Sequence, residues 1–90
     1  MATCMAFIIE GKVQGVFYRV EAERQAKRLG LTGFVRNEPN GTVCAVACGE
    51  EGALAAFELW LWEGPEHAKV SSVKKSKSLL GPFSSFEVER

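Results

Sequence analysis

The sequence predicts an α+β fold in which an antiparallel sheet carries two helices on one face. Two segments have the 3.6-residue apolar spacing of amphipathic helices, extended apolar segments flank them, and a turn rich in Pro, Asn and Gly lies near the middle of the chain. The expected order is β-α-β-β-α-β with a short extra strand at the C-terminus, which is the order of a ferredoxin-like sandwich. The 90 residues suffice for one domain, 1–90, with a modest core.

The chain is expected to begin with a strand and a helix. Residues 5–12 form an extended apolar run typical of a buried strand. Residues 18–29 place apolar side chains near one helical face, at Val20, Ala22, Ala26 and Leu29. Gly30 follows where a left-handed C-cap belongs, so the helix should end there.

The next two strands should pair as a hairpin, and a second helix should follow them. Strands at 31–36 and 42–48 flank Glu38-Pro39-Asn40-Gly41, whose composition is typical of a turn. Apolar residues recur at helical spacing through 51–62, and Gly64-Pro65 should end this helix.

Two strands complete the predicted sheet. Side chains in residues 69–77 alternate between two faces, as in a strand with one solvent-exposed face or a strand at the edge of the sheet. Residues 85–89 form the short last strand. The run Lys74-Lys75-Ser76-Lys77 could suggest a nucleic-acid patch, but an exposed strand also favours lysines because they oppose edge-to-edge pairing.

Composition excludes several classes of partner. The 11 basic and 11 acidic residues give a net charge of zero and a pI near 6.6, without the positive surplus that non-specific nucleic-acid binding requires. No basic segment precedes an apolar run, and no run approaches the ~20 residues that span a bilayer. We therefore expect a cytoplasmic monomer with no nucleic-acid and no membrane partner.

The three cysteines have no spacing typical of a disulfide scaffold. Cys44 and Cys48 on one strand would lie about 13 Å apart, beyond disulfide reach. We expect free thiols and a reducing compartment. A zinc site would need further ligands beside the single His67, so we expect no metal.

The segment from Gly11 to Arg19 has the layout of an anion site. Gly11 and Gly15 bracket a turn between a strand and a helix, and glycines let backbone N–H groups turn inward. The first N–H groups of a helix lack partners and attract anions, and the planar guanidinium of Arg19 matches phosphate oxygens. The alternative is an ordinary strand-to-helix turn with a surface arginine.

Two sequence blocks resemble those of the acylphosphatase family. The first matches at Gly11, Val13, Gln14, Gly15, Val16, Tyr18 and Arg19. The second, Gly33-Phe34-Val35-Arg36-Asn37 with Gly41-Thr42-Val43, follows at the expected separation, and Gly64-Pro65 and Phe86-Glu87-Val88 also fit. The resemblance implies hydrolysis of the carboxyl–phosphate bond of a small-molecule acyl phosphate, without a cofactor or metal, and binding of phosphate or sulfate as a product-like ligand.

The resemblance also assigns roles to particular residues. Arg19 would bind the phosphoryl group, and Asn37 would orient the attacking water. The backbone donors would be the N–H groups of Gln14, Gly15, Val16, Phe17, Tyr18 and Arg19, in a loop shaped by Gly11 and Gly15. An amide can hold a water but is too weak a base to deprotonate it. From the residues alone, Asn37 could instead be a simple turn residue.

The neighbours of Asn37 and the two faces of strand 42–48 add further expectations. Arg36 should point away from the face that Asn37 uses, because side chains alternate along a strand. Glu38, where some relatives have threonine, should point to solvent. The resemblance places Val43, Ala45 and Ala47 on the helix side, so Ile8, Cys44 and Val46 should lie on the open face, as a harmless patch or an interaction surface.

Two other functions are considered. The same fold could handle carbamoyl phosphate or serve as a non-catalytic regulatory domain that binds a small anion. It could also bind RNA on its open sheet face, but that requires stacking aromatics and a basic surface, where this chain offers Cys44 and Val46.

Overall fold

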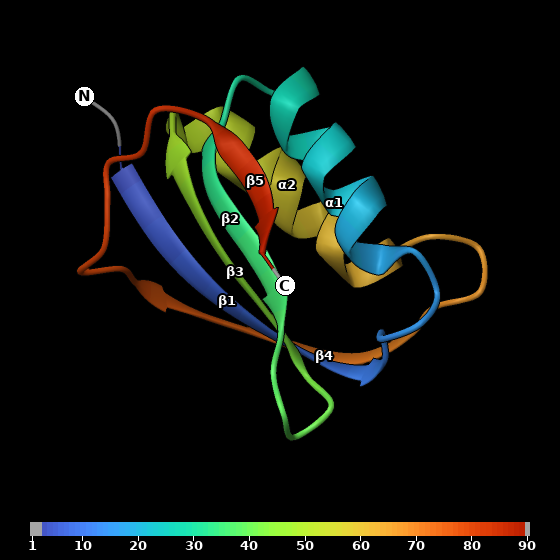
Figure 1. The fold of residues 1–90 in the computed structure, drawn as a ribbon. Coiled ribbons are helices and arrows are strands. Elements are labelled where there is room, and N and C mark those ends of the chain that lie inside the picture. Colours follow the sequence, from blue (N-terminus) through green and yellow to red (C-terminus); the bar gives the residue numbers. More distant parts are fainter. Residues whose placement is uncertain (1–2, 90) are drawn as a thin grey trace.

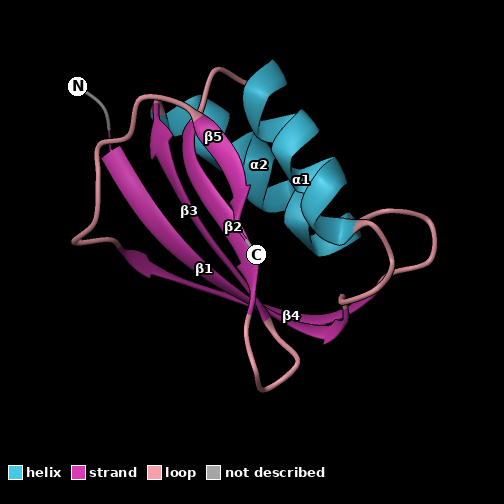
Figure 2. Ribbon diagram, in the orientation of Figure 1, coloured by secondary structure: helices cyan, strands magenta, loops and turns pink. Residues whose placement is uncertain are grey.

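The computed structural model describes residues 3–89 of the chain. Its elements are β1 (Thr3–Lys12), α1 (Tyr18–Arg28), β2 (Thr32–Asn37), β3 (Val43–Gly49), α2 (Glu51–Glu63), β4 (Lys69–Lys77) and β5 (Phe86–Glu89). The strands form one sheet in the order β4-β1-β3-β2-β5, and both helices pack against the same face (Figures 1 and 2). The predicted ferredoxin-like sandwich with an additional C-terminal strand is confirmed.

The sheet is mixed, whereas the sequence predicted antiparallel pairing throughout. The pairs β1–β3, β1–β4 and β2–β3 are antiparallel, but β5 runs parallel to β2. The chain reverses after β4 and crosses the end of the sheet before it enters β5 at the opposite edge (Figure 1). The direction of β5 therefore follows from this crossing.

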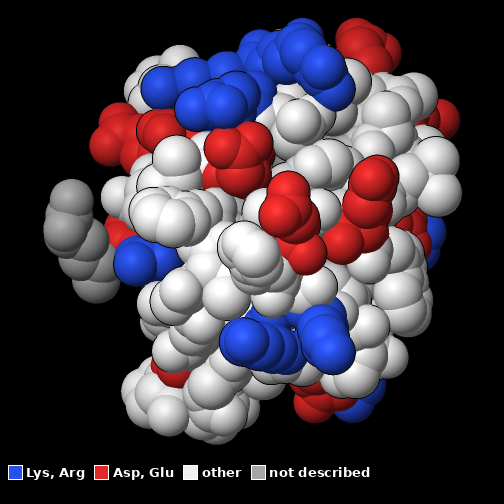
Figure 3. Space-filling view, turned by 90° about the vertical axis from the view of Figure 1, so that its right-hand side faces the viewer, with Lys and Arg blue, Asp and Glu red and all other residues white. Residues whose placement is uncertain are grey.

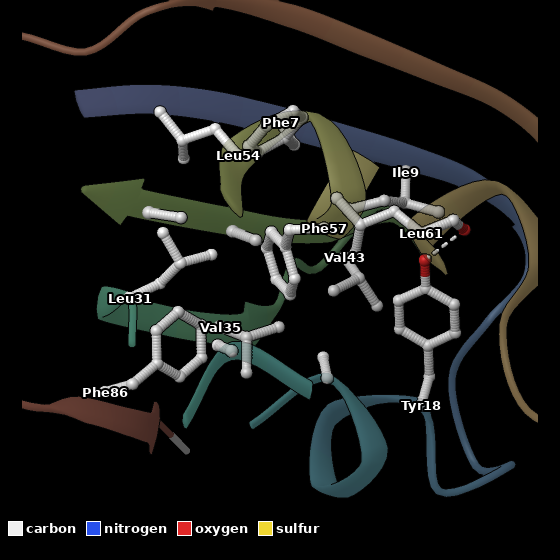
Figure 4. Packing of buried hydrophobic residues seen from close by; sticks show 14 of the residues in the cluster. Phe7, Ile9, Tyr18, Leu31, Val35, Val43, Leu54, Phe57, Leu61 and Phe86 are labelled. Atoms are coloured by element: carbon white, nitrogen blue, oxygen red, sulfur yellow. Dashed lines mark hydrogen bonds between the residues drawn. The ribbon is translucent and has the colours of Figure 1, made fainter. Parts of the chain in front are cut away.

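The core lies between the sheet and the helices. Phe57 of α2 is fully buried, and its ring packs edge-on against Phe7 and Phe86, with centroids 6.0 and 5.9 Å away (Figure 4). The buried residues of α1 include the small Ala22 and Ala26, which let its backbone approach the sheet. Val20 was expected on this buried face, but it is 47% exposed.

The other sheet face is buried in its middle. Cys44 and Val46 lie opposite the helix-side residues, as expected, yet they are only 9% and 3% exposed, whereas Ile8 is 37% exposed. Part of the cover is the β4–β5 connection (residues 78–85), whose Phe83 ring packs edge-on against Phe34 at 5.7 Å. Much of the apolar face is therefore occupied by the protein's own chain and is not available as an interaction surface.

Cys4 and Cys48 form a disulfide, so the prediction of three free thiols was wrong. The two residues face each other in the β1–β3 register, with Cα atoms 4.0 Å apart, and Cys44 is the free cysteine, buried. Cys44 and Cys48 are too far apart on one strand to pair, whereas the antiparallel register of β1 against β3 places Cys4 directly opposite Cys48. The cysteines therefore no longer support a reducing compartment.

Tyr18 ties the start of α1 to the end of α2. Its hydroxyl donates a hydrogen bond to the Leu61 carbonyl at 2.6 Å (Figure 4). Four residues after Leu61 the chain has Pro65, which has no N–H, so the helix itself cannot satisfy this carbonyl. The Tyr18 ring also packs against Trp60, with centroids 5.3 Å apart. These contacts fix the end of the loop that precedes α1.

No helix within residues 3–89 is long and apolar enough to cross a membrane.

Replacement of both Cys4 and Cys48 by alanine should lower the free energy of unfolding by about 2–4 kcal/mol. The crosslink joins residues 44 positions apart and restricts the unfolded chain. Urea unfolding with and without reductant measures the effect, and reductant should not affect the double variant. Cys44→Ala should keep its sensitivity to reductant. Three titratable thiols in the oxidised protein would contradict the disulfide.

Tyr18→Phe should lower the free energy of unfolding by about 1–3 kcal/mol at pH 7, because the Leu61 carbonyl loses its donor. Burial raises the pKa of Tyr18 well above its ordinary value of 10.0. The folded state therefore holds the phenol neutral while the unfolded state ionises, so this contribution is complete below pH 10 and falls as the pH rises further. Since Tyr18 is the single tyrosine, tyrosinate absorbance should appear only with unfolding. Ionisation at pH 10 in the folded protein would contradict this.

Candidate active site

A cleft of about 350 Å³ lies where the β1–α1 loop (residues 13–17), the first turn of α1, the end of β2 and β5 meet. We call it the first cleft. Its lining residues are Val13, Gly15, Phe17, Tyr18, Arg19, Val20, Asn37 and Val88. It therefore brings together Arg19, which was predicted to bind the phosphoryl group, and Asn37, which was predicted to orient the attacking water. Gln14 and Val16 do not line it.

The backbone of the β1–α1 loop is shaped by left-handed residues. Gly15 has φ 74° and Phe17 has φ 64°, and such residues between right-handed ones turn successive N–H groups toward one point. Phe17 is also the N-cap of α1, and no side chain caps this helix. The N-terminus of α1, where the first N–H groups have no intrahelical partner, thus borders the first cleft.

Gly11 has a different role from Gly15. It lies in β1 at a bulge against β4, with φ 127°, and a Cβ there would come within 2.1 Å of the Lys69 carbonyl oxygen. A side chain therefore cannot be accommodated where the strand leaves the sheet. Gly11 is therefore required by this close approach of two backbones, and it does not line the first cleft.

The side chain of Gln14 braces the loop against the β2–β3 turn. Its Nε2 donates to the Glu38 carbonyl at 2.8 Å and to the Thr42 carbonyl at 2.9 Å. From the sequence, Gln14 was predicted to contribute only its backbone N–H, so these side-chain hydrogen bonds were not predicted. The position of a glutamine between the two loop glycines was the one indication in the sequence of such a role. Its acceptors lie 24 and 28 positions away, so only the fold brings them close.

Arg19 is held at the first cleft by β5. Its Nη1 donates to the Glu89 carbonyl at 2.8 Å. A guanidinium has five N–H donors in a fixed plane, so this bond orients the group and leaves other donors for a ligand. The sequence predicted that Arg19 binds the anion. It did not predict that the Glu89 carbonyl positions the guanidinium.

Asn37 presents an unsatisfied acceptor. It is the last residue of β2, and its side chain lies on the helix side, as that of Val35 does. The Oδ1 atom is buried and accepts no hydrogen bond from the part of the chain that the structure describes. A buried acceptor without a donor costs about 1–3 kcal/mol, so such an atom in a cleft needs an explanation beyond folding.

Arg36 and Glu38 lie on the opposite side of β2. Arg36 Nε pairs with Glu38 Oε1 at 2.6 Å, and the guanidinium lies 5.2 Å over the Phe34 ring. The hydrogen bond to Glu38 raises the pKa of Arg36. Arg36 therefore points away from Asn37, as expected. Glu38 also faces away from the cleft, but in an ion pair and not free in solvent. No carboxylate of the described residues lines the first cleft.

Other reactive groups lie away from the cleft. Burial raises the pKa of the Cys44 thiol, on the far sheet face. Within residues 3–89, no three His, Cys, Asp or Glu side chains gather in a way that could hold a metal ion. On the face in Figure 3, basic side chains gather along the top and at the lower centre, and acidic side chains lie between them.

The chain is similar to known proteins over nearly its whole length. The family model for acylphosphatase matches residues 5–88. A curated acylphosphatase from Coxiella burnetii (strain RSA 493 / Nine Mile phase I) is 43% identical over 86 residues, which are 96% of this chain and 90% of that protein.

Solved structures show the same similarity in three dimensions. An acylphosphatase structure from Coxiella burnetii matches with a TM-score of 0.93 at 42% identity, covering 98% of this chain and 93% of the other. The acylphosphatase from Bacillus subtilis matches over the full length of both chains, with a TM-score of 0.87 at 34% identity. The chain therefore belongs to the acylphosphatase family and is an enzyme that hydrolyses acyl phosphates.

Proposed function

We propose that the first cleft is the active site, in which Arg19 and the backbone N–H groups of residues 14–19 bind the phosphoryl group and Asn37 orients the attacking water. The observation that carries this proposal is the buried, unpartnered Oδ1 of Asn37 in the same cleft as the Arg19 guanidinium. A water that donates to this oxygen would satisfy it and would be fixed beside the anion site.

The chemistry of an acyl phosphate fits a site of this kind. Its leaving group is a carboxylate, a weak base that departs without protonation, so no general acid is needed. The loose transition state of phosphoryl transfer requires positioning and stabilisation of charge on the equatorial oxygens. Converging N–H groups and one guanidinium provide both, and no carboxylate of the described residues opposes them in the cleft.

The reaction exchanges one bond at phosphorus for another. The water oxygen forms a bond to phosphorus while the bond from phosphorus to the carboxylate oxygen breaks, in line on opposite sides. As the family resemblance implies, the proton of the water passes to an oxygen of the phosphoryl group. Asn37 only holds the water, because an amide is too weak a base to accept the proton.

Further expectations complete the proposal. Inorganic phosphate or sulfate should occupy the same site weakly, as a product-like ligand. The enzyme should act as a monomer without a cofactor. Its cytoplasmic location stays a prediction from the sequence, which the Cys4–Cys48 disulfide does not support.

Arg19→Lys should lower kcat/KM for benzoyl phosphate by about 100- to 1,000-fold, since an ammonium group cannot replace the planar fork. Phosphate should also raise the Tm of this variant less than that of the wild type. Arg28→Lys, at the other end of α1 and outside the cleft, is the matched control and should keep full activity. Retention of most activity by Arg19→Lys would remove the guanidinium from the mechanism.

Asn37→Ala should reduce turnover by at least about 100-fold while the rise of Tm with phosphate persists. Because the substitution removes an unsatisfied acceptor, the Tm without ligand should not fall. Asn40→Ala is the control, since Asn40 Oδ1 accepts from the Thr42 N–H and hydroxyl in the same hairpin. That variant should lose stability and keep its turnover. Joint loss of phosphate binding and turnover in Asn37→Ala would indicate collapse of the turn instead.

A further inference from the structure

We propose that Phe17 is a specificity-determining residue whose ring contacts the acyl group of the substrate, so that the enzyme prefers acyl phosphates with a neutral, apolar acyl group. This inference rests on the proposed function of the first cleft. It concerns the part of the substrate that the phosphoryl-binding groups do not touch.

Phe17 combines two unfavourable features. Its side chain is 76% exposed, and it is the one described non-glycine residue with a positive φ, at 64°. A left-handed conformation costs an ordinary side chain about 1–2 kcal/mol, whereas glycine or asparagine adopts it readily. The anion-binding loop explains why the backbone is left-handed here, but it does not explain an aromatic side chain.

Folding provides no reason for the aromatic ring either. Phe17 is not among the residues of the hydrophobic core or those packed against it. No aromatic pair or cation–π contact of the described residues includes Phe17. An exposed aromatic side chain at a strained position, on the rim of a cleft, is consistent with a contact to a ligand.

The position of Phe17 indicates which part of the ligand it meets. It lines the first cleft and also a second cleft of about 360 Å³, which lies between the β1–α1 loop and the connection from α2 to β4. The other residues of the second cleft are Val16, Glu21, Trp60, Pro65, Glu66 and His67. Figure 1 shows this connection beside the loop. Phe17 thus stands at the boundary of the two clefts.

In-line displacement directs the acyl group toward this boundary. The attacking water and the leaving carboxylate occupy opposite sides of the phosphorus. Asn37, which would hold the water, lines the first cleft and not the second. In this proposal the carboxylate and its acyl substituent extend away from Asn37 and toward the second cleft, which Phe17 lines and Asn37 does not.

The residues beyond Phe17 suit a neutral, apolar group. Trp60 and Pro65 provide apolar surface in the second cleft. Its acidic members are Glu21, which pairs with Arg24 at 3.1 Å, and Glu66, whose Oε2 lies 3.6 Å from His67 Nε2. No Lys or Arg lines this cleft among the described residues, so a second anionic group on the substrate would find no fixed cation.

The test compares benzoyl phosphate with acetyl phosphate. Wild-type enzyme should have the higher kcat/KM for benzoyl phosphate. Phe17→Asn should lower the ratio of kcat/KM for benzoyl phosphate to kcat/KM for acetyl phosphate about tenfold, the size expected for loss of an aromatic contact. Asparagine tolerates the left-handed backbone, so the Tm of this variant should not fall.

Two further variants separate the acyl contact from other effects. Phe17→Tyr keeps the ring and should keep the preference for benzoyl phosphate. Leu59→Asn removes a side chain that is 73% exposed on α2 and lines neither cleft, and it should leave the ratio unchanged. An unchanged ratio in Phe17→Asn, or an equal loss on both substrates, overturns this proposal while the proposed function stands. Failure of the wild type to hydrolyse either substrate overturns the proposed function, and this inference with it.

Discussion

The two hydrogen bonds from the Gln14 amide to the carbonyls of Glu38 and Thr42 connect the parts of the site that would otherwise be independent. The β1–α1 loop carries the converging N–H groups, and the β2–β3 hairpin carries Asn37. Neither segment can set the position of the other through the sheet alone, because the loop lies outside it. Gln14 fixes the separation between them, and a catalytic site tolerates little error in such a separation.

The unfavourable features of the molecule are concentrated at this site. Within residues 3–89 the one buried core side chain that carries a hydroxyl is Tyr18, and this hydroxyl binds the carbonyl that α2 cannot satisfy. In contrast, the first cleft holds an acceptor without a donor at Asn37 and a strained aromatic residue at Phe17. A stable scaffold can carry both, and both become useful only when a ligand is present.

Local patterns predicted most of the elements, because apolar periodicity and turn residues act over a few positions. Arg19 and Asn37 could be placed in one site because two blocks carry them at a characteristic separation. What the sequence did not predict depends on long-range register. The pairing of Cys4 with Cys48, the parallel direction of β5 and the acceptors of Gln14 all require knowing which residues lie opposite each other across the sheet. The packing of residues 78–85 over the open sheet face could not be predicted for the same reason. Their sequence does not indicate which strands they contact.

Because of its position, the disulfide should affect the stability of the enzyme but not its catalytic rate. Cys4 lies at the start of β1 and Gly11 near its end, so seven strand residues place the crosslink roughly 24 Å from the end of the sheet that borders the first cleft. Reduction would increase the conformational entropy of the unfolded chain without moving Arg19, Gln14 or Asn37 in the folded protein. Oxidising or reducing conditions should then change the half-life of the enzyme at high temperature, while the turnover of each folded molecule stays the same.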